Sequence, residues 1–312
     1  MPLNTKDLKS FFESIRPDFS GQIEFDAPLA KATYYQIGGS ADVLVTPKTQ
    51  EDLQKIHQAL HVTGSRFFIL GWGSNLLVSD DGFRGVVIRM KHLFQEIEIK
   101  EEGLLRLGAS VGGSSLLRRA QREGWSGLSA LTGIPGSVGG MVTMNAGTHL
   151  GEFKDVAVSV DYIDLRSNHF EIERHRVGGN SFSYRKNHFL TEDQLVTHAE
   201  VRFGRDDPKK IEAEINHLYT RRKETQPVDF PSCGSVFMNP KSSGLHAWQV
   251  IDRLKLRGHR IGNAQFAEKH SNFIINLGGA RAVDVKGLID LAKSRALNEL
   301  NVELHEEVRY IT

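Results

Sequence analysis

The sequence has a single cysteine, Cys233, among 312 residues. One cysteine cannot form a disulfide within the chain, and the 13 histidines do not stand with it at the spacing of a metal-binding cage. We therefore expect no resident metal ion and a reducing compartment.

Long hydrophobic runs are also missing. The sequence contains no run of about 18 apolar residues, the length that a membrane-spanning helix needs. Residues 1–20 are polar and charged, and they lack the apolar core of a secretion signal. We expect a cytoplasmic protein without a membrane partner.

An excess of charge of either sign is absent as well. The 39 basic residues are balanced by 38 acidic ones, which leaves a formal net charge of +1. This balance gives no broad electrostatic reason to expect a nucleic-acid partner. Because 39% of the residues are hydrophobic, the chain can bury a core and is not disordered. The expected partner is a small molecule.

The first part of the chain alternates strand-like runs with one amphipathic helix, predicted at residues 51–61. Strands are expected at residues 41–45, 66–70, 76–78 and 85–88. The first two strands and the helix form a β-α-β unit. The second strand leads directly into a glycine loop, Gly71-Trp72-Gly73-Ser74-Asn75.

Short strands dominate the middle of the chain, with one helix at residues 114–122. These strands are expected at residues 94–99, 104–107, 157–163 and 195–203. Between them lies a second glycine-rich segment, residues 133–147, with five glycines in fifteen residues. This composition predicts a loop throughout that segment.

Two helices organise the remainder. One is expected at residues 208–222, and the other has Asp284 as its N-cap and Val285, Leu288, Ile289, Ala292 and Leu297 along its buried stripe. A final strand is predicted at residues 307–311. The chain then divides into an N-terminal extension and three domains, at residues 1–26, 27–92, 93–219 and 220–312.

The two glycine loops favour a nucleotide ligand, because residues without a Cβ let backbone N–H groups approach a pyrophosphate closely. Neither loop has the spacing of a P-loop or of the G-x-G-x-x-G fingerprint, so kinase and Rossmann interpretations weaken. Either loop alone is also compatible with a simple tight turn.

Three short segments carry side chains that could take part in catalysis or in ligand binding. Gly234 permits an unusual backbone angle that aims the Ser235 hydroxyl outward from the start of a strand, although most turn serines are only turn residues. Arg185, after Tyr184, suits bidentate binding of a carboxylate, or the pair simply ends a strand. Of Glu306 and Glu307, only one can face a site, because side chains alternate along a strand.

Taken together, the motifs resemble the UDP-N-acetylenolpyruvoylglucosamine reductase (UDP-N-acetylmuramate dehydrogenase) family from about residue 27 to residue 311. They stand in the family's order: Gln36-Ile37-Gly38-Gly39; Gly71-x-Gly73-Ser74-Asn75-Leu76-Leu77; Gly133-Ile134-Pro135-Gly136-Ser137-Val138-Gly139-Gly140; Asn145-Ala146-Gly147; Tyr184-Arg185; Gly234-Ser235-Val236-Phe237-x-Asn239-Pro240; Lys269-His270-x-Asn272-Phe273; and Glu307-Val308-Arg309. Each motif is weak alone, but this order and spacing are specific.

The resemblance implies an α+β fold, with a two-part FAD-binding domain of the vanillyl-alcohol-oxidase type and a C-terminal α+β substrate-binding domain. FAD would lie between the two parts, and both glycine loops would contact it. The implied FAD-binding residues are Ile37, Gly38, Gly71, Gly73, Ser74, Asn75, Gly133, Ile134, Pro135, Gly136, Ser137, Gly139, Gly140, Asn145 and Gly147.

The resemblance also implies the reaction. NADPH, as co-substrate, reduces FAD, and the enolpyruvyl ether of UDP-N-acetylglucosamine then takes up a hydride and a proton to give UDP-N-acetylmuramate for peptidoglycan synthesis. Negative charge develops on the substrate carboxylate, and the family assigns Arg185 and Glu307 to stabilise it. Ser235 would donate the proton. Tyr184 and Asn239 are the implied substrate-binding residues.

Some residues depart from the family pattern. Lys186-Asn187-His188 follows Arg185, where the family often has a serine two residues after the arginine, and Trp72 is bulkier than expected. No extra loop with a substrate-clamping tyrosine stands between Asn187 and Gln194, so the chain resembles the shorter subtype of the family. We expect a monomer or weak dimer.

Two other functions remain open on the sequence alone. A flavin oxidase of the same fold would act on a small alcohol or sugar and would hold its flavin covalently through His or Cys, but no histidine stands in a glycine loop. A non-catalytic FAD-binding relative would have lost Ser235, Arg185 and Glu307. Cys233 has no recognisable base near it in the sequence and is not expected to be a nucleophile.

Overall fold

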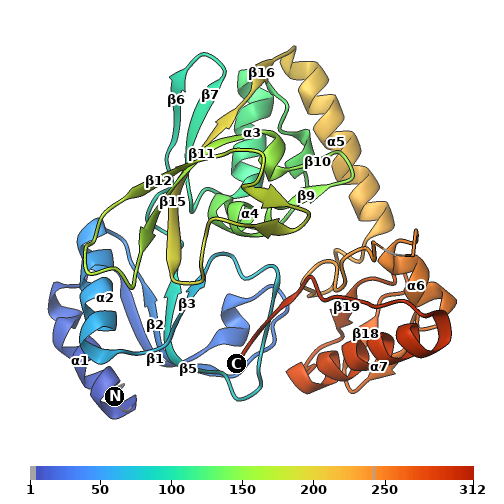
Figure 1. Ribbon diagram of the computed structural model, residues 1–312, viewed down its shortest axis with the longest axis horizontal. Coiled ribbons are helices and arrows are strands. Elements are labelled where there is room, and N and C mark those ends of the chain that lie inside the picture. Colours follow the sequence, from blue (N-terminus) through green and yellow to red (C-terminus); the bar gives the residue numbers. More distant parts are fainter. Residues whose placement is uncertain (1–4, 242) are drawn as a thin grey trace. The chain divides into compact units, whose positions relative to one another are not determined.

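The computed structural model describes residues 5–241 and 243–312, and they form two compact units (Figure 1). Unit 1 contains residues up to Asp26, Asp42–Trp72 and Arg84–Thr220. Unit 2 contains Ala27–Ala41, Gly73–Phe83 and Arg221–Thr312. The first four residues of the predicted N-terminal extension lie outside the described residues. The division into three domains stays a prediction.

Unit 1 contains two main sheets, the helices that cover them and several short ladders. Its helices are α1 (Thr5–Ile15), η1 (Arg16–Asp18), α2 (Gln50–Thr63), α3 (Gly113–Glu123), η3 (Ser129–Leu131), α4 (Val138–Met144), η4 (Phe153–Asp155) and most of α5 (Pro208–Thr225). Its strands are β1 (Gln22–Pro28), β2 (Ser40–Thr46), β3 (Phe67–Leu70), β5 (Phe83–Arg89), β6 (Ile97–Glu101), β7 (Leu104–Gly108), β8 (Trp125–Ser126), β9 (Gly147–Thr148), β10 (Gly151–Glu152), β11 (Ala157–Asp164), β12 (Glu173–Arg176), β13 (Phe182–Ser183), β14 (Lys186–Asn187), β15 (Gln194–Arg202) and β16 (Gly204–Arg205). One end of β1, of β2 and of β5 extends into the residues of unit 2.

A four-stranded sheet in the order β1-β2-β5-β3 forms the first part of unit 1. The predicted β-α-β unit is confirmed, because α2 connects β2 to β3. Thr49 and Asp52 cap α2 reciprocally, since each side chain accepts a hydrogen bond from the backbone of the other. Leu53, Ile56 and Leu60 of α2 are fully buried against this sheet's core.

A five-stranded sheet in the order β12-β11-β15-β7-β6 forms the second part. Its neighbouring strands run antiparallel, and Val160, Ala199 and Leu107 on one face enter the core with α3 and α4. Successive side chains of a strand point to opposite faces of the sheet, so every second residue enters this core. The strand predicted at residues 94–99 begins only at Ile97, because Phe94 has a positive φ of 61°.

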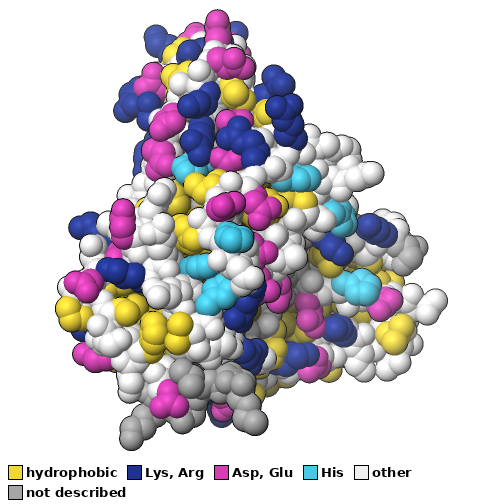
Figure 2. Space-filling view, turned by 60° about the vertical axis from the view of Figure 1, so that its left-hand side comes forward, with side chains coloured by type: hydrophobic (Ala, Val, Ile, Leu, Met, Phe, Trp, Pro, Cys, Tyr) yellow, Lys and Arg dark blue, Asp and Glu magenta, His cyan; other side chains and the backbone are white. Residues whose placement is uncertain are grey.

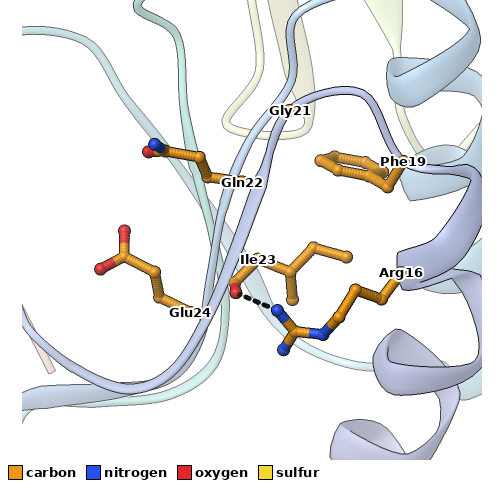
Figure 3. A pocket seen from close by; sticks show the side chains of 6 residues that line it. All are labelled: Arg16, Phe19, Gly21, Gln22, Ile23 and Glu24. Atoms are coloured by element: carbon orange, nitrogen blue, oxygen red, sulfur yellow. Dashed lines mark hydrogen bonds between the residues drawn. The ribbon is translucent and has the colours of Figure 1, made fainter.

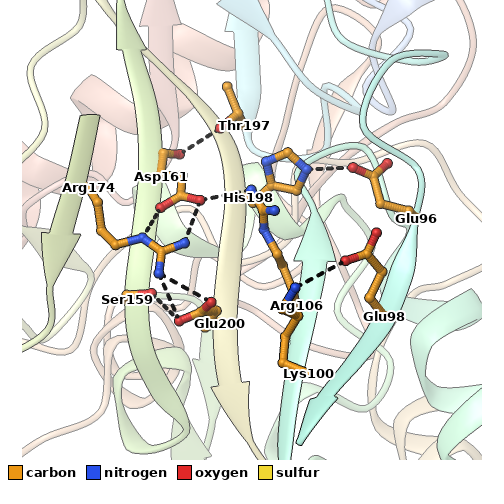
Figure 4. A network of polar contacts seen from close by, with 10 residues as sticks. All are labelled: Glu96, Glu98, Lys100, Arg106, Ser159, Asp161, Arg174, Thr197, His198 and Glu200. Carbon is orange, nitrogen blue, oxygen red and sulfur yellow. Dashed lines mark hydrogen bonds and ion pairs between the residues drawn. The ribbon is translucent and has the colours of Figure 1, made fainter. Parts of the chain in front are cut away.

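The other face of this sheet carries a network of charged side chains (Figure 4). Asp161 is 4% exposed and accepts from Arg106 at 2.9 Å and from Arg174 at 2.7 Å. His198, on the next strand, contacts Glu96 at 2.5 Å. Because a buried carboxylate is stable only when paired, these contacts let the sheet bury Asp161.

Unit 2 is built from segments that are distant in the sequence. Its elements are η2 (Leu29–Ala32), β4 (Leu76–Val78), α6 (Ala247–Arg253), β17 (Arg260–Ile261), β18 (Ala264–Phe266), β19 (Ile274–Asn276), α7 (Ala282–Leu300), β20 (Arg309–Ile311) and the end of α5. The final strand β20 pairs in parallel with β4, and β17, β18 and β19 form an antiparallel sheet. One hydrophobic core joins Tyr35 and Leu77 to the buried faces of α6 and α7.

The long C-terminal helix differs from its prediction at both ends. α7 begins at Ala282 with Arg281 as N-cap, and Asp284 is the third helical residue, whose carboxylate accepts from the Arg281 N–H at 3.0 Å. Asp284 is therefore not the N-cap. Leu297 is 55% exposed, and Ala296 takes the buried position at that end of the helix.

The surface agrees with the near-zero net charge. On the face shown in Figure 2, basic and acidic side chains are mixed and do not separate into areas of one sign. Among the described residues, no helix combines the length and the hydrophobicity that crossing a bilayer requires.

Candidate flavin and substrate site

The first glycine loop passes from unit 1 to unit 2 between Trp72 and Gly73. In unit 2, Gly73 has a φ of 66°, and a Cβ there would lie 2.5 Å from the Ala32 carbonyl oxygen. A Cβ on Gly38 would similarly lie 2.7 Å from the Val78 Cβ. Both positions therefore require glycine.

The other predicted residues of these two segments differ in exposure. The side chain of Ile37 is buried in the core of unit 2, so only its backbone is available to a ligand. Ser74 and Asn75 are half-buried.

Within unit 1 the two glycine loops meet. A Cβ on Gly71 would lie 3.1 Å from the Ser137 hydroxyl oxygen, so the backbone of the first loop faces the second. The indole ring of Trp72 packs against Gly112, where a Cβ would be 2.4 Å from the ring. The bulk of Trp72 is thus accommodated by a glycine on the neighbouring segment.

The second glycine segment is not a loop throughout. Residues 133–137 are irregular, with φ of 75° at Gly133 and 147° at Gly136, but Val138–Met144 form helix α4. The prediction of a loop over residues 133–147 is therefore wrong for α4. α4 begins close to the end of β7, because the Gly139 N–H donates to the Ala109 carbonyl at 2.9 Å.

The predicted residues Gly133, Ile134, Pro135, Gly136 and Ser137 thus precede α4, whereas Gly139 and Gly140 lie within it. A Cβ on Gly139 would lie 3.2 Å from the Cβ of Ala109, which explains the need for a small residue there. Gly140 has no such close neighbour.

Asn145 and Gly147 follow α4 and form a connected cluster in unit 1. Asn145 is fully buried with a φ of 43°, and its side chain donates to the Ser183 carbonyl at 2.9 Å and to Glu152 at 3.0 Å. A Cβ on Gly147 would lie 2.2 Å from the Gly151 carbonyl oxygen. These contacts bind the end of α4 to the β9–β10 and β13–β14 hairpins.

Tyr184 and Arg185 form the two-residue turn between β13 and β14 and do not end an isolated strand. Arg185 has a φ of 58°, and its side chain is 14% exposed. Its guanidinium donates to the Gly147 carbonyl at 2.9 Å and lies 5.0 Å from the centre of the Tyr184 ring. A non-glycine residue held at positive φ often marks a functional position.

In unit 2 the structure brings two of the predicted catalytic residues onto neighbouring segments. The N–H of Glu307 donates to the Val236 carbonyl at 2.7 Å, so Glu307 lies opposite the residue that follows Ser235. Asn75 joins them, because its side-chain amide donates to the Glu307 carbonyl at 2.9 Å. The third predicted catalytic residue, Arg185, belongs to unit 1.

Gly234 has the predicted unusual backbone, with a φ of 81° and open space around the position of a Cβ. Ser235 is half-buried and lies in an irregular segment, so the predicted strand at this point is wrong. Two isolated bridges form along this segment, one between Ser232 and Ile275 and one between Phe237 and Glu306. The carboxylate of Glu306 pairs with Lys293 at 3.0 Å.

Two further residues discussed from the sequence, Asn239 and Cys233, make contacts that stabilise the fold of unit 2. Asn239 is exposed, and its side-chain oxygen accepts from the Ala247 N–H at 3.0 Å, at the start of α6. Cys233 is buried beside the Tyr35 hydroxyl. Burial, with Glu307 nearby, raises the pKa of the Cys233 thiol to about 12, so it is not a nucleophile at neutral pH.

Two residues were missed from the sequence. Asn272 is 4% exposed, and its side chain both accepts from the Phe237 N–H at 3.0 Å and donates to the Phe237 carbonyl at 2.9 Å. Its own carbonyl accepts from the Val236 N–H at 2.9 Å. The only signal for Asn272 in the sequence was its place in the motif Lys269-His270-x-Asn272-Phe273. Glu152, which pairs with Arg185 at 3.4 Å, had no such signal.

The residues present fit a nucleotide cofactor. The hydroxyls of Ser110 and Thr132 are buried without a hydrogen-bond partner among the described residues, and both belong to segments that frame the second glycine loop. Thr132 directly precedes Gly133. Val111, which follows Ser110, accepts a hydrogen bond from the Val138 N–H at the end of the second glycine loop. Buried polar groups normally have partners, so these hydroxyls indicate a polar ligand at the loop.

A separate pocket of about 410 Å³ lies in unit 1 between η1 and β1 (Figure 3). It is lined by Arg16, Phe19, Gly21, Gln22, Ile23 and Glu24, none of them a predicted site residue. The Arg16 guanidinium already donates to Glu13 at 2.9 Å and to the Ile23 carbonyl at 3.1 Å. We therefore assign no ligand to this pocket.

Comparison with known proteins gives matches along almost the entire chain. Residues 41–171 match an FAD binding domain, and residues 226–311 match the C-terminal domain of UDP-N-acetylenolpyruvoylglucosamine reductase. The reductase of Heliobacterium modesticaldum is 38% identical over 95% of this chain and 93% of its own length. That of Carboxydothermus hydrogenoformans is 38% identical over 98% and 99%.

A solved structure agrees with these matches. The UDP-N-acetylenolpyruvylglucosamine reductase of Thermus caldophilus superposes with a TM-score of 0.77 and 34% identity, over 94% of this chain and 99% of the other. The predicted fold class is confirmed: an α+β protein with an FAD-binding domain, followed by a distinct C-terminal domain.

Proposed function

Because the chain belongs to the UDP-N-acetylenolpyruvoylglucosamine reductase family, as its motifs predicted, we propose that it reduces the enolpyruvyl ether of UDP-N-acetylglucosamine to UDP-N-acetylmuramate. A hydride adds to the terminal vinyl carbon, and a proton adds to the carbon next to the carboxylate. We place this step in the synthesis of peptidoglycan precursors in the cytoplasm and propose that the protein acts as a monomer or weak dimer.

FAD is the cofactor, and we propose that the glycine loops hold it. Bound FAD supplies the hydride, with NADPH as the co-substrate that provides it. Gly71 and Ser137 of unit 1 lie against each other. Ser110 and Thr132, whose buried hydroxyls have no hydrogen-bond partner among the described residues, belong to the segments that frame the second loop. Glycines at these positions let backbone N–H groups approach a pyrophosphate.

We propose that Ser235 donates the proton. A serine hydroxyl is a weak acid, but a strongly basic carbanion-like centre takes its proton when the two are within hydrogen-bond distance. Ser235 is half-buried and follows Gly234, which has a φ of 81°. This supports the role because a residue that is not fully buried remains accessible to a substrate.

We further propose that Arg185 and Glu307 face the substrate carboxylate, on which negative charge develops. A guanidinium stabilises that charge directly, and a protonated carboxyl group would do so by donating a hydrogen bond. Tyr184, whose ring lies against Arg185, and Asn239 are proposed substrate contacts.

One observation carries the assignment of the C-terminal residues. The segment of Ser235, the segment of Glu307 and the glycine-loop residue Asn75 are joined within unit 2 by backbone hydrogen bonds and by the side-chain amide of Asn75. Proton donor, charge partner and a flavin-loop residue are thus held in one rigid arrangement, as catalysis by positioned groups requires.

The test begins with purified protein, which we expect to be yellow. Its flavin should be released on denaturation, whereas covalent attachment would favour an oxidase. Ser235→Ala should leave the reduction of the flavin by NADPH nearly unchanged and slow its reoxidation by the enolpyruvyl substrate by about 10³-fold or more in stopped-flow measurements. A colourless protein that takes up no FAD, or equal slowing of both half-reactions, would contradict the proposal.

A further inference from the structure

Arg185 is held in unit 1 by contacts that orient its guanidinium. One terminal nitrogen, Nη2, donates to the Gly147 carbonyl at 2.9 Å, and the other, Nη1, contacts Oε1 of Glu152 at 3.4 Å. The Tyr184 ring supports the guanidinium from one side at 5.0 Å. The 3.4 Å contact between Nη1 and Glu152 is longer than a strong charge-assisted hydrogen bond.

Glu152 has stronger partners on its other oxygen. Its carboxylate is 13% exposed, and Oε2 accepts from the Asn145 amide at 3.0 Å and pairs with Lys154 at 2.8 Å. Lys154 is 40% exposed, so its ammonium group can follow the carboxylate without a large desolvation cost. The Glu152 carboxylate therefore lies closer to Lys154, at 2.8 Å, than to Arg185, at 3.4 Å.

From this geometry we propose that Glu152 is a positioning residue that orients Arg185 in the empty site and gives up Nη1 to an incoming substrate carboxylate. This inference rests on the proposed function, in which Arg185 binds that carboxylate. When the ligand arrives, Asn145 and Lys154 retain Glu152 through Oε2. The negative charge of Glu152 competes with the ligand, so the site favours ligands whose carboxylate can take its place at Arg185.

Two nucleotides that differ in one group test the competition on the FAD-loaded protein. UDP-N-acetylmuramate carries a carboxylate, and UDP-N-acetylglucosamine does not. Glu152→Gln keeps an oxygen for Asn145 but removes the charge, so calorimetry should give about fivefold tighter binding of UDP-N-acetylmuramate and unchanged binding of UDP-N-acetylglucosamine. Reoxidation at saturating substrate should change by less than about twofold, because Glu152 no longer contacts Nη1 once the substrate carboxylate is bound.

Lys154→Met provides a test of opposite sign at an exposed position that does not touch Arg185. With its lysine partner removed, Glu152 should pair more closely with Arg185, and UDP-N-acetylmuramate should bind a few-fold more weakly. The inference would be overturned by equal changes in affinity for both nucleotides, by no change in either variant, or by changes of the same sign in the two variants. The proposed function would still stand in these cases if the wild-type protein turns over the enolpyruvyl substrate. A wild-type protein that binds neither nucleotide overturns both.

Discussion

The side-chain amide of Asn75 donates a 2.9 Å hydrogen bond to the backbone carbonyl of Glu307, which lies 232 residues later in the sequence. The backbone reinforces this contact, because the Arg309 N–H donates to the Asn75 carbonyl at 3.1 Å. The first glycine loop and the C-terminal segment are thereby fastened to each other within unit 2.

Asn75→Asp should weaken this connection. The carboxylate would place an acceptor against the Glu307 carbonyl, so the hydrogen bond would be lost and the two oxygens would repel each other. Together these effects should lower the free energy of unfolding by about 1–3 kcal/mol. Urea unfolding measures the change. Asn298→Asp, on the exposed surface of α7, is the control and should shift stability by less than about 0.5 kcal/mol. Equal effects at both positions would show that the Asn75 contact contributes little.

Asn272 should be needed both for stability and for the substrate half-reaction. Asn272→Leu has nearly the same volume but leaves the N–H and the carbonyl of Phe237 without partners, so we expect a loss of about 2–4 kcal/mol. Asn272→Asp keeps the acceptor and should lose less. In stopped-flow experiments, reoxidation by substrate should slow more than reduction by NADPH, because Asn272 positions the segment next to Ser235. Loss of both half-reactions in parallel would contradict this role.

Gly147→Ala should be strongly destabilising and should reduce flavin content. The new Cβ would lie 2.2 Å from the Gly151 carbonyl oxygen and 2.6 Å from the Glu152 Cα, both backbone atoms that cannot move alone. We expect a loss of about 2 kcal/mol or more. Gly179→Ala is a matched control, because nothing lies within 4 Å of a Cβ there. The ratio of flavin to protein measures the cofactor content, and thermal unfolding measures the stability. Equal results for the two variants would contradict the close approach of Gly147 to the backbone of Gly151 and Glu152.

Cys233 predicts a loss of stability at high pH. Burial raises the pKa of its thiol from 9.0 to about 12, so above pH 9 the unfolded chain loses a proton that the folded chain keeps. The Cys233 thiol therefore leaves the free energy of unfolding unchanged below pH 9. As the pH rises towards 12, its titration lowers the free energy of unfolding by up to about 4 kcal/mol. Cys233→Ala should flatten this part of the curve of unfolding free energy against pH. An unchanged slope would contradict the burial argument, as would rapid reaction of the native thiol with an alkylating reagent at pH 8.

The sequence predicted best the elements whose hydrophobic pattern is regular. α2, α3 and α5 were found almost to their ends, because their apolar faces recur at helical spacing. α4 was missed because Gly139 and Gly140 lower helix propensity. The helix is supported by burial of Val138, Met141 and Val142 in the core and by the close approach of Gly139 to Ala109. The short helix α6 was not predicted either.

The candidate site was predicted through its motifs, but its supporting contacts were not. No local pattern relates Glu152 to Arg185, since the two residues are 33 positions apart and meet only when two hairpins pack. The position of Asp284 was also ambiguous, because an acidic residue serves equally well as an N-cap or as the third residue of a capping box. Long-range packing decides such cases.

The parallel pairing of β20 with β4 also bears on how the chain is made. β4 is synthesised long before its partner Arg309–Ile311. During translation β4 keeps an open edge until β20 has left the ribosome, and exposed strand edges invite wrong association. Unit 2 therefore acquires its native form only after β20 has been synthesised, whereas most of unit 1 is free to fold earlier on the nascent chain.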